Sequence, residues 1–314
     1  MAKYRTQLPQ LDGGIYLTDS GLETTLVFTD GLELKEFAAF ELLNDTDGRE
    51  RLYNYFARHA KIAKENKTGF ILDSVTWRAS SAWGIKLGYS EEDLEEINLK
   101  SIEILERVRN DFEGQSSKFV ISGCLGPHGD GYKPTEKLSI QEAETYHTRQ
   151  IETFSKSNAD MVTAFTMTYS EEAIGIVRAA AYIGMPVVIS FTVETDGKLP
   201  SGETLKQAIE AVDQATENAA AYFMLNCAHP VHFEHILLPD QPWASRLKGI
   251  RANASSKSHA ELDESEVLDD GNPVELGRQY KNFMERLPDL KILGGCCGTD
   301  HRHIEEICMA CVLE

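Results

Sequence analysis

Short apolar runs alternate with longer amphipathic stretches along this sequence, and this alternation constrains the fold more than any other feature. The runs are rich in Val, Ile, Leu and Phe, which is the composition of strands buried on both faces. The pattern predicts strands at 15–17, 70–75, 119–122, 161–164, 187–191, 222–225, 249–252 and 292–293. It predicts helices at 49–66, 91–110, 140–157, 171–183, 204–217 and 273–286. A last helix is expected to start at Thr299 and Asp300, whose side chains can cap it, and to run to the C-terminus.

Eight strands separated by helices predict an α/β fold, a (β/α)8 barrel of the TIM type. A doubly wound open sheet is the alternative, but no Gly-x-Gly-x-x-Gly follows any of the expected strands. The sequence shows no linker, low-complexity tract or internal repeat. We therefore expect a single barrel domain over residues 1–314.

The charge of the chain excludes several classes of partner. A formal net charge of −19 argues against nucleic acid and against anionic membrane surfaces as ligands. No apolar run reaches the length of a membrane span, and the first residues lack the hydrophobic core of a signal peptide. We therefore expect a cytoplasmic protein. In that reducing compartment, the six cysteines are expected to be thiols or metal ligands and not disulfides.

Polar and sulfur-containing side chains follow the expected strands. In such barrels, the active site gathers where the strands reach their carboxyl ends. In chain order, the residues at or just beyond these ends are Asp19, Ser74, Arg78, Cys124, Thr166, Glu194, Asn226, Cys227, Asn253, Cys296 and Cys297. The fold is therefore expected to bring them to one face.

Two adjacent cysteines, Cys296 and Cys297, lie in the run Gly-Gly-Cys-Cys-Gly-Thr at 294–299. The glycines allow a sharp turn that aims both thiols at one point, which favours a metal site or a disulfide. With Cys227 they would form a three-thiolate zinc site with an open fourth position, as in catalytic zinc sites. A fourth thiolate from Cys124 would close the site and make it structural. Cys227 as a small buried hydrophobe and Cys296–Cys297 as a vicinal disulfide are the other interpretations.

These motifs resemble those of the zinc-dependent homocysteine S-methyltransferase family, which includes the betaine–homocysteine and S-methylmethionine–homocysteine enzymes. The resemblance rests on Asn226-Cys227 and the Gly-Gly-Cys-Cys-Gly-Thr run, and it extends from Thr18-Asp19-Ser20-Gly21 to the last helix. It implies a (β/α)8 barrel with zinc bound by Cys227, Cys296 and Cys297. It also implies an enzyme that methylates homocysteine to form methionine, and so a place in methionine biosynthesis.

The implied chemistry depends on the metal. Free thiols are mostly protonated at neutral pH and are then poor nucleophiles. Zinc at an open site keeps an incoming sulfur in its thiolate form, which can attack an aligned methyl group. We expect no catalytic residue beyond the zinc site and no organic cofactor.

The expected substrate-binding residues match the family pattern in part. By resemblance, Asp19 contacts the amino group of homocysteine, although Ser20 replaces the usual first glycine of the turn. The family carries a glutamate after the fourth strand that also contacts this amine, and Phe165 occupies its position here. We hypothesise that Glu194, after the fifth strand, supplies the missing charge; pairing with Lys198 is the alternative role.

Two further residues complete the expected substrate site. Asn226 belongs to the Asn-Cys motif. Arg78 lies where relatives often present a neutral side chain, and its guanidinium would suit a carboxylate on the acceptor or the donor. A salt bridge at the barrel rim is its alternative role.

The sequence thus predicts a zinc-dependent methyltransferase whose partners are a small thiol acceptor and a methyl donor. No folate- or cobalamin-binding module is expected within this sequence, which favours a small sulfonium or ammonium donor. The alternatives are a methyltransferase that acts on a different thiol or selenol, a non-catalytic zinc or thiol protein, and a redox protein. A homo-oligomer is left open.

Overall fold

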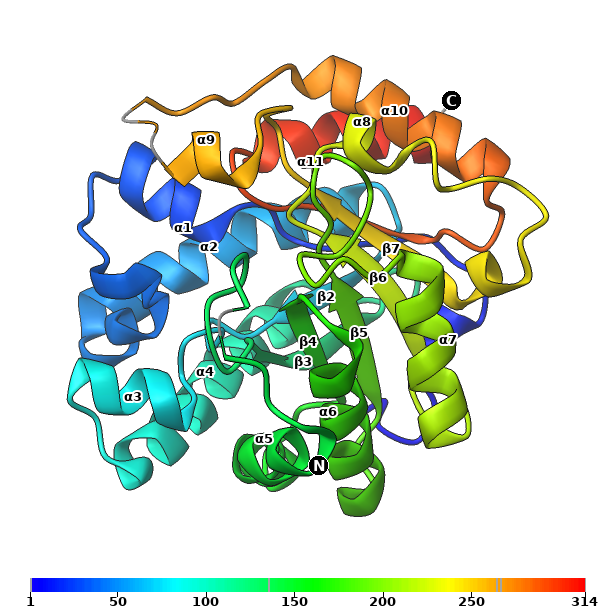
Figure 1. Cartoon of the computed structure of the whole chain (residues 1–314). Helices are drawn as coiled ribbons and strands as arrows, with labels where there is room; N and C mark the ends of the chain where they lie inside the picture. Colours follow the sequence, from blue (N-terminus) through cyan, green and yellow to red (C-terminus); the bar gives the residue numbers. More distant parts are fainter. Residues whose placement is uncertain (1, 135, 264, 266, 314) are drawn as a thin grey trace.

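Eight parallel strands close into a barrel in which each strand pairs with its neighbours in sequence, and β1 (Tyr16–Leu17) also pairs with β8 (Ile292–Gly295). Leu17 is opposite Phe70 of β2 (Gly69–Asp73) on one side and Leu293 on the other. The structure is a computed structural model and describes residues 2–134, 136–263, 265 and 267–313. Figure 1 shows the strands surrounded by helices. The predicted TIM-type barrel is confirmed; the domain limits 1–314 stay a prediction.

The remaining elements follow the expected order. The other strands are β3 (Phe119–Leu125), β4 (Met161–Met167), β5 (Val187–Phe191), β6 (Tyr222–Asn226) and β7 (Leu247–Ala252). The α-helices are α1 (Leu22–Thr24), α2 (Thr46–Glu65), α3 (Ser81–Leu87), α4 (Glu91–Phe112), α5 (Ile140–Ser155), α6 (Ser170–Ile183), α7 (Leu205–Thr216), α8 (Pro230–Phe233), α9 (His259–Asp263), α10 (Pro273–Arg286) and α11 (His301–Cys308). Each predicted strand and helix has a counterpart here, and the short helices α1, α3 and α9 were not predicted. Among the described residues, no helix has the length and apolar character needed to cross a membrane.

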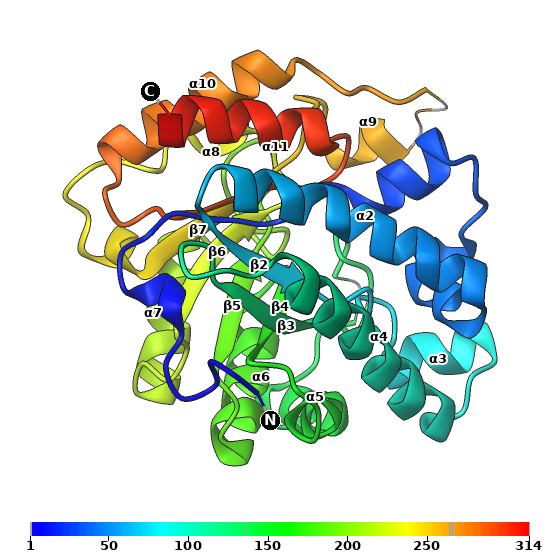
Figure 2. The same cartoon turned by 180° about the vertical axis from the view of Figure 1, so that it is seen from behind.

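Local side-chain signals start several of the long helices. Ser90, Ser139 and Thr204 each accept a hydrogen bond from the backbone N–H three residues on, and the side chain at that position bonds back. These reciprocal bonds satisfy amide groups that the first helical turn leaves free. The Asp300 side chain accepts from the backbone N–H of Arg302, so the predicted cap of α11 is confirmed. In Figure 2, α11 lies against α2. This contact brings the last helix of the chain next to one of the first.

The interior of the barrel changes from apolar to polar along the strands. The layer toward the amino-terminal ends of the strands is an apolar cluster of Leu8, Tyr16, Ile71, Val120, Met161, Val188, Tyr222, Met224 and Ile292. Two residues further along, where the side chain faces the same side of the sheet, come Asp73, Ser122, Thr163 and Ser190. A larger apolar core fills the space between the strands and the helices. The barrel interior is therefore polar at the carboxyl ends of the strands and apolar beneath this polar layer.

A buried tyrosine forms hydrogen bonds to both β7 and β8, the last two strands before the cysteine pair. The Tyr280 hydroxyl, on α10, accepts from Ala252 N at 2.8 Å and donates to Gly294 O at 2.5 Å. A side chain at Gly294 would collide with the Thr18 hydroxyl. Glycine is therefore needed there, because β8 and the end of β1 approach closely. This contact determines where the chain turns toward Cys296.

Candidate metal and substrate site

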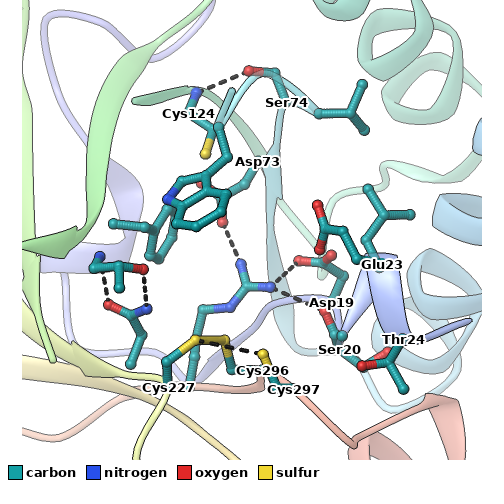
Figure 3. A pocket seen from close by; sticks show the side chains of 18 of the residues that line it. Asp19, Ser20, Glu23, Thr24, Asp73, Ser74, Cys124, Cys227, Cys296 and Cys297 are labelled. Atoms are coloured by element: carbon teal, nitrogen blue, oxygen red, sulfur yellow. Dashed lines mark hydrogen bonds and ion pairs between the residues drawn. A yellow bond between two sulfur atoms is a disulfide. The ribbon is translucent and has the colours of Figure 1, made fainter. Parts of the chain in front are cut away.

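A cavity with an empty volume of about 740 Å³ opens at the carboxyl ends of the strands. The residues that line it come from the segment after β1, from the ends of β2, β3, β4, β6 and β7, from the loops after β2 and β3, and from the turn after β8. They are Asp19, Ser20, Gly21, Leu22, Glu23, Thr24, Asp73, Ser74, Val75, Trp77, Cys124, Tyr132, Phe165, Thr166, Asn226, Cys227, Arg251, Cys296 and Cys297. Figure 3 shows Cys227, Cys296 and Cys297 together along one side of this cavity, with Cys124 apart from them beside Ser74 and Asp73.

The sulfurs of Cys227, Cys296 and Cys297 lie within 4.8 Å of one another. Cys227 directly follows β6 and has a left-handed backbone, with φ of 55°. That conformation is uncommon for a residue with a side chain. Two hydrogen bonds support it: Cys227 N donates to Arg251 O at 3.1 Å, and Asn253 Nδ2 donates to Cys227 O at 3.1 Å. The predicted convergence of the three cysteines at one point is therefore present.

The cysteine pair is supported from the neighbouring strand. Cys296 N donates to Ala252 O at 2.8 Å, and the Thr299 hydroxyl donates to Cys296 O at 2.7 Å. A side chain at Gly21 would meet Cys296 O at 2.6 Å, so the segment after β1 packs tightly against this turn. The turn thus takes its shape from contacts to β7, to the β1 segment and within itself.

Cys227 and Cys296 are joined by a disulfide, and Cys227 Sγ lies 3.9 Å from Cys297 Sγ. The sequence analysis expected thiols or metal ligands; the structure pairs Cys227 with Cys296, so these two are not free thiols, whereas the three sulfurs still cluster as metal ligands would. The physical reason is proximity: sulfurs that converge closely enough to share a metal ion are also close enough to be oxidised to a disulfide. Cys296 pairs with Cys227 and not with its neighbour in sequence, and Cys124, Cys308 and Cys311 are free cysteines.

The donor set fits zinc when the disulfide is reduced. Zinc–sulfur bonds of about 2.3 Å in a tetrahedron place the sulfurs about 3.8 Å apart. The separation of the Cys227 and Cys297 sulfurs, 3.9 Å, matches this spacing. Cys124 lines the same cavity but is not one of the three clustered sulfurs. Burial also raises the pKa of its thiol well above the usual range, which disfavours a thiolate there.

Arg251 forms the centre of a buried array of charges. Its Nη1 donates to Asp73 Oδ2 at 2.8 Å, and its Nη2 lies 2.7 Å from Asp19 Oδ1. The guanidinium also donates to the backbone oxygens of Ser20 and Gly295. The arginine thereby links the segment after β1 to β2 and to the strand end that leads into the cysteine pair.

The array changes the acidity of its members. Burial raises the pKa of Asp73 to about 7, against the opposing effect of Arg251. For Arg251, burial acts to lower the pKa, but the carboxylates of Asp19 and Asp73 outweigh it and raise the pKa above its usual range. Both side chains are more than nine-tenths buried. The sequence analysis did not identify Arg251 and Asp73 as site residues. A charged residue at the end of an apolar strand could have indicated them.

Asp19, Ser20 and Asn226 lie in the cavity wall, as expected for binding residues. Asp19 Oδ2 accepts from the Tyr55 hydroxyl at 3.0 Å. The hydroxyl of Ser20 is 2.8 Å from His59 Nε2. Asn226 donates to the Thr166 hydroxyl at 2.9 Å and accepts from Thr166 N at 3.0 Å. The Asn226 side chain therefore orders the end of β4, where Thr166 has a φ of 61°.

Phe165 also lines the cavity, and its ring faces a cation of the protein itself. The Arg251 guanidinium carbon lies 5.0 Å from the ring centroid, within the range of a cation–π contact. A carboxylate at this position would face the same guanidinium. The aromatic ring instead covers one side of the charge array.

Arg78 and Glu194 lie outside the residues that line the cavity. The Arg78 guanidinium is stacked between two indoles, 3.9 Å from the Trp77 ring and 3.6 Å from the Trp83 ring. Burial lowers its pKa to about 10. The predicted rim salt bridge is not among the ion pairs of the described residues. Trp77 lines the cavity, so Arg78 lies directly behind part of its wall.

Glu194 belongs to the loop after β5, where its backbone N–H donates to Lys198 O at 2.8 Å. Burial and the neighbouring Asp196 raise the pKa of its carboxyl group. The side chain of Lys198 pairs with Asp196, 3.9 Å away, and not with Glu194. The structure therefore does not bring Glu194 into the cavity wall with Asp19.

Glu23 is an acidic cavity residue that the sequence analysis did not single out. It lies in the short helix α1, four residues after Asp19, and lines the cavity. Burial raises the pKa of its carboxyl group, and Asp19 adds to the effect. A glutamate four residues after a candidate ligand was visible in the sequence, but its orientation was not.

Comparison with known proteins gives a consistent result. Residues 17–311 match the family model described as "Homocysteine S-methyltransferase". Homocysteine S-methyltransferases 2 and 1 of Arabidopsis thaliana are each 22% identical to this chain, over 76% of it and 77% of each relative. The metallated form of the Escherichia coli homocysteine methyltransferase MmuM aligns with a TM-score of 0.72 and 17% identity, covering 95% of this chain and 97% of that one. Its oxidised form aligns with a TM-score of 0.71 and 18% identity, covering 93% and 94%.

Proposed function

The chain belongs to the homocysteine S-methyltransferase family and is thus a methyltransferase; on this premise, we propose that it uses zinc to transfer a methyl group from a small cationic donor to the thiol of homocysteine. The observation that carries the proposal is the convergence of the three cysteine sulfurs beside an acid-lined cavity. Methionine is the expected product.

Cys227, Cys296 and Cys297 would hold the metal once the disulfide is reduced. Zinc bound there supplies Lewis acidity, which lowers the pKa of an incoming thiol so that its sulfur is nucleophilic at neutral pH. In the transfer, a carbon–sulfur bond forms to the acceptor as the bond from the methyl carbon to the donor breaks. The bonding electrons stay with the donor, and the proton of the acceptor thiol goes to solvent.

The protein's other contribution is binding and orientation. Reactants held in line react far faster than reactants that meet by diffusion. We assign Asp19, Ser20 and Asn226 to the acceptor side of the cavity, because they line the same space as the sulfurs. The acidic wall favours a donor that carries positive charge over an anionic one.

Arg78 and Glu194 remain proposed substrate contacts that need movement of a side chain or loop to reach the cavity. For Arg78, the supporting observation is that its Nε has no hydrogen-bond partner although the residue is buried. A carboxylate of a substrate would satisfy it. If Glu194→Ala leaves the affinity for homocysteine unchanged, Glu194 has no role in binding the amine.

The test of the proposed function starts from reduced protein loaded with zinc. Bound zinc is measured by elemental analysis, with about one ion per chain expected. Methionine formation from homocysteine is then assayed with S-methylmethionine, S-adenosylmethionine, betaine and methyl-folate as donors. Cys297→Ser should lose both the metal and turnover. Full activity in that variant would exclude the mechanism.

A methyltransferase that acts on another thiol or selenol is the second candidate, and Phe165 is the observation that favours it. The ring presents no negative charge to an amino group. Comparison of acceptors with and without an α-amino group separates the two candidates. A non-catalytic thiol protein, the third interpretation, would bind zinc without taking up added homocysteine.

A further inference from the structure

The cavity contains more acidic than basic side chains. Among the described residues that line it, Asp19, Glu23 and Asp73 are acidic and Arg251 is basic. Asp19 and Asp73 share Arg251, as described above. Glu23 forms no close ion pair among the described residues, and the guanidinium groups of Arg251 and Arg78 act on its carboxyl group only from a longer distance. The cavity therefore has one acidic side chain that no cation of the described residues contacts directly.

One oxygen of a second carboxyl group in the same cavity has no hydrogen-bond partner. Asp73 is 7% exposed, and its Oδ1 has no hydrogen-bond donor of suitable geometry. A buried oxygen without a donor costs free energy, because it has lost water and gained nothing in exchange. Both carboxyl groups belong to residues that line the cavity that the substrates would occupy. A ligand that donates hydrogen bonds or carries positive charge would satisfy them.

We propose that Glu23 is a specificity-determining residue that binds the positively charged group of a substrate next to the cysteine cluster. This inference rests on the proposed function, since it assigns part of the same cavity. Asp19 is less available for this role, because Arg251 and Tyr55 already occupy its two oxygens. Glu194 lies outside the cavity wall, and Phe165 carries no charge.

The positive group can come from either substrate. An acceptor such as homocysteine carries an ammonium group, and a sulfonium or quaternary ammonium donor carries its charge at the methyl-bearing atom. Glu23 provides a carboxylate for both, and Trp77 lines the same cavity with an aromatic ring. The chemistry is shared, so binding experiments with separate probes must distinguish the two sources.

The experiment compares wild type, Glu23→Gln and Glu23→Asp as reduced, zinc-loaded protein. Calorimetry measures the binding of three probes: L-homocysteine, 4-mercaptobutanoate, which has the thiol and carboxylate without the amine, and trimethylsulfonium. Glu33→Gln is the control, because it makes the same change at an exposed position. Thermal unfolding verifies that each variant is folded.

If Glu23 binds the acceptor's ammonium group, Glu23→Gln weakens homocysteine binding about tenfold or more and leaves 4-mercaptobutanoate binding unchanged. If it binds the donor, trimethylsulfonium binding falls instead and the ratio between the two thiols is preserved. Glu23→Asp should retain more affinity than Glu23→Gln. Affinities within twofold of wild type for all three probes overturn the inference, as does a wild type that binds none of them.

These binding measurements separate the inference from the proposed function. A wild type that binds the probes but forms no methionine with any donor refutes the proposed reaction. In that case, the binding comparison between wild type and Glu23→Gln still decides the role of Glu23. A wild type that methylates homocysteine while Glu23→Gln binds all probes normally refutes only the role of Glu23.

Discussion

Arg251 and Asp73 form an ion pair across the interior of the barrel, with 2.8 Å between Nη1 of the arginine and Oδ2 of the aspartate. The arginine comes from β7 and the aspartate from β2, strands that are not neighbours in the sheet. The pair therefore forms only when the barrel closes. With Asp19 it connects the predicted acceptor site to the turn that carries the cysteines (Figure 3).

Arg251→Met should strongly destabilise the protein. The change leaves Asp19 and Asp73 buried without their shared cation, and removal of one partner of a buried ion pair typically costs about 3–5 kcal/mol. Urea unfolding monitored by circular dichroism measures the loss. Arg251→Met combined with Asp73→Asn should recover part of it, since one uncompensated charge is then absent. A double variant no more stable than Arg251→Met would contradict this account.

Asp73 should make stability depend on pH in a direction opposite to that of most carboxyl groups. Its pKa is about 7 in the folded protein, above the value near 4 expected in the unfolded chain. Between these values the folded state binds more protons, so this group's contribution to the free energy of unfolding falls as the pH rises from about 4 to about 7.

The measurement is urea unfolding of wild type and Asp73→Asn at several pH values in that interval. Asparagine resembles the protonated form at every pH, so the variant should gain stability relative to wild type as the pH rises. A difference between the two proteins that is constant from pH 4 to 7 would show that the pKa of Asp73 is not raised.

Asp300→Ala should destabilise the protein by about 1–2 kcal/mol, because it removes the N-cap of α11. Burial acts to raise the pKa of Asp300, but hydrogen bonds from His303 and Arg302 lower it below its usual range. The stability that these bonds contribute is present above the unfolded-state pKa near 4 and is lost as the pH falls through the lower folded-state pKa. Thermal unfolding at neutral and acidic pH measures both effects. Equal losses at pH 7 and pH 2 would contradict the charge-dependent part.

Cys124→Ser should leave the zinc content of the reduced protein unchanged, whereas Cys297→Ser should reduce it to background. The reason is geometric, since the Cys297 sulfur belongs to the cluster within 4.8 Å and the Cys124 sulfur does not. Elemental analysis after dialysis against a weak chelator provides the measurement. Loss of zinc in both variants would indicate a closed four-thiolate site in place of an open one.

The sequence alone was sufficient for the barrel, because local patterns specify its elements. The short apolar run at 187–191 has the length and β-branched composition of a buried strand, and side chains such as Asp300 cap helices through contacts a few residues away. The three clustered cysteines were also predictable, since the carboxyl ends of parallel strands meet at one face of a barrel. Their oxidation state was not, because thiols that converge can bind a metal or form a disulfide.

The tertiary structure decided which charged groups meet inside the cavity. Arg251, Asp73 and Asp19 are far apart in the chain, and their contact depends on barrel closure and on which face of each strand a side chain occupies. Glu194 and Glu23 show the same limit: both follow strands, but only Glu23 lines the cavity. Hydrophobic periodicity determines elements because it acts over a few residues. The partner of a buried charge depends on distances between strands, which are settled only when the whole barrel has formed.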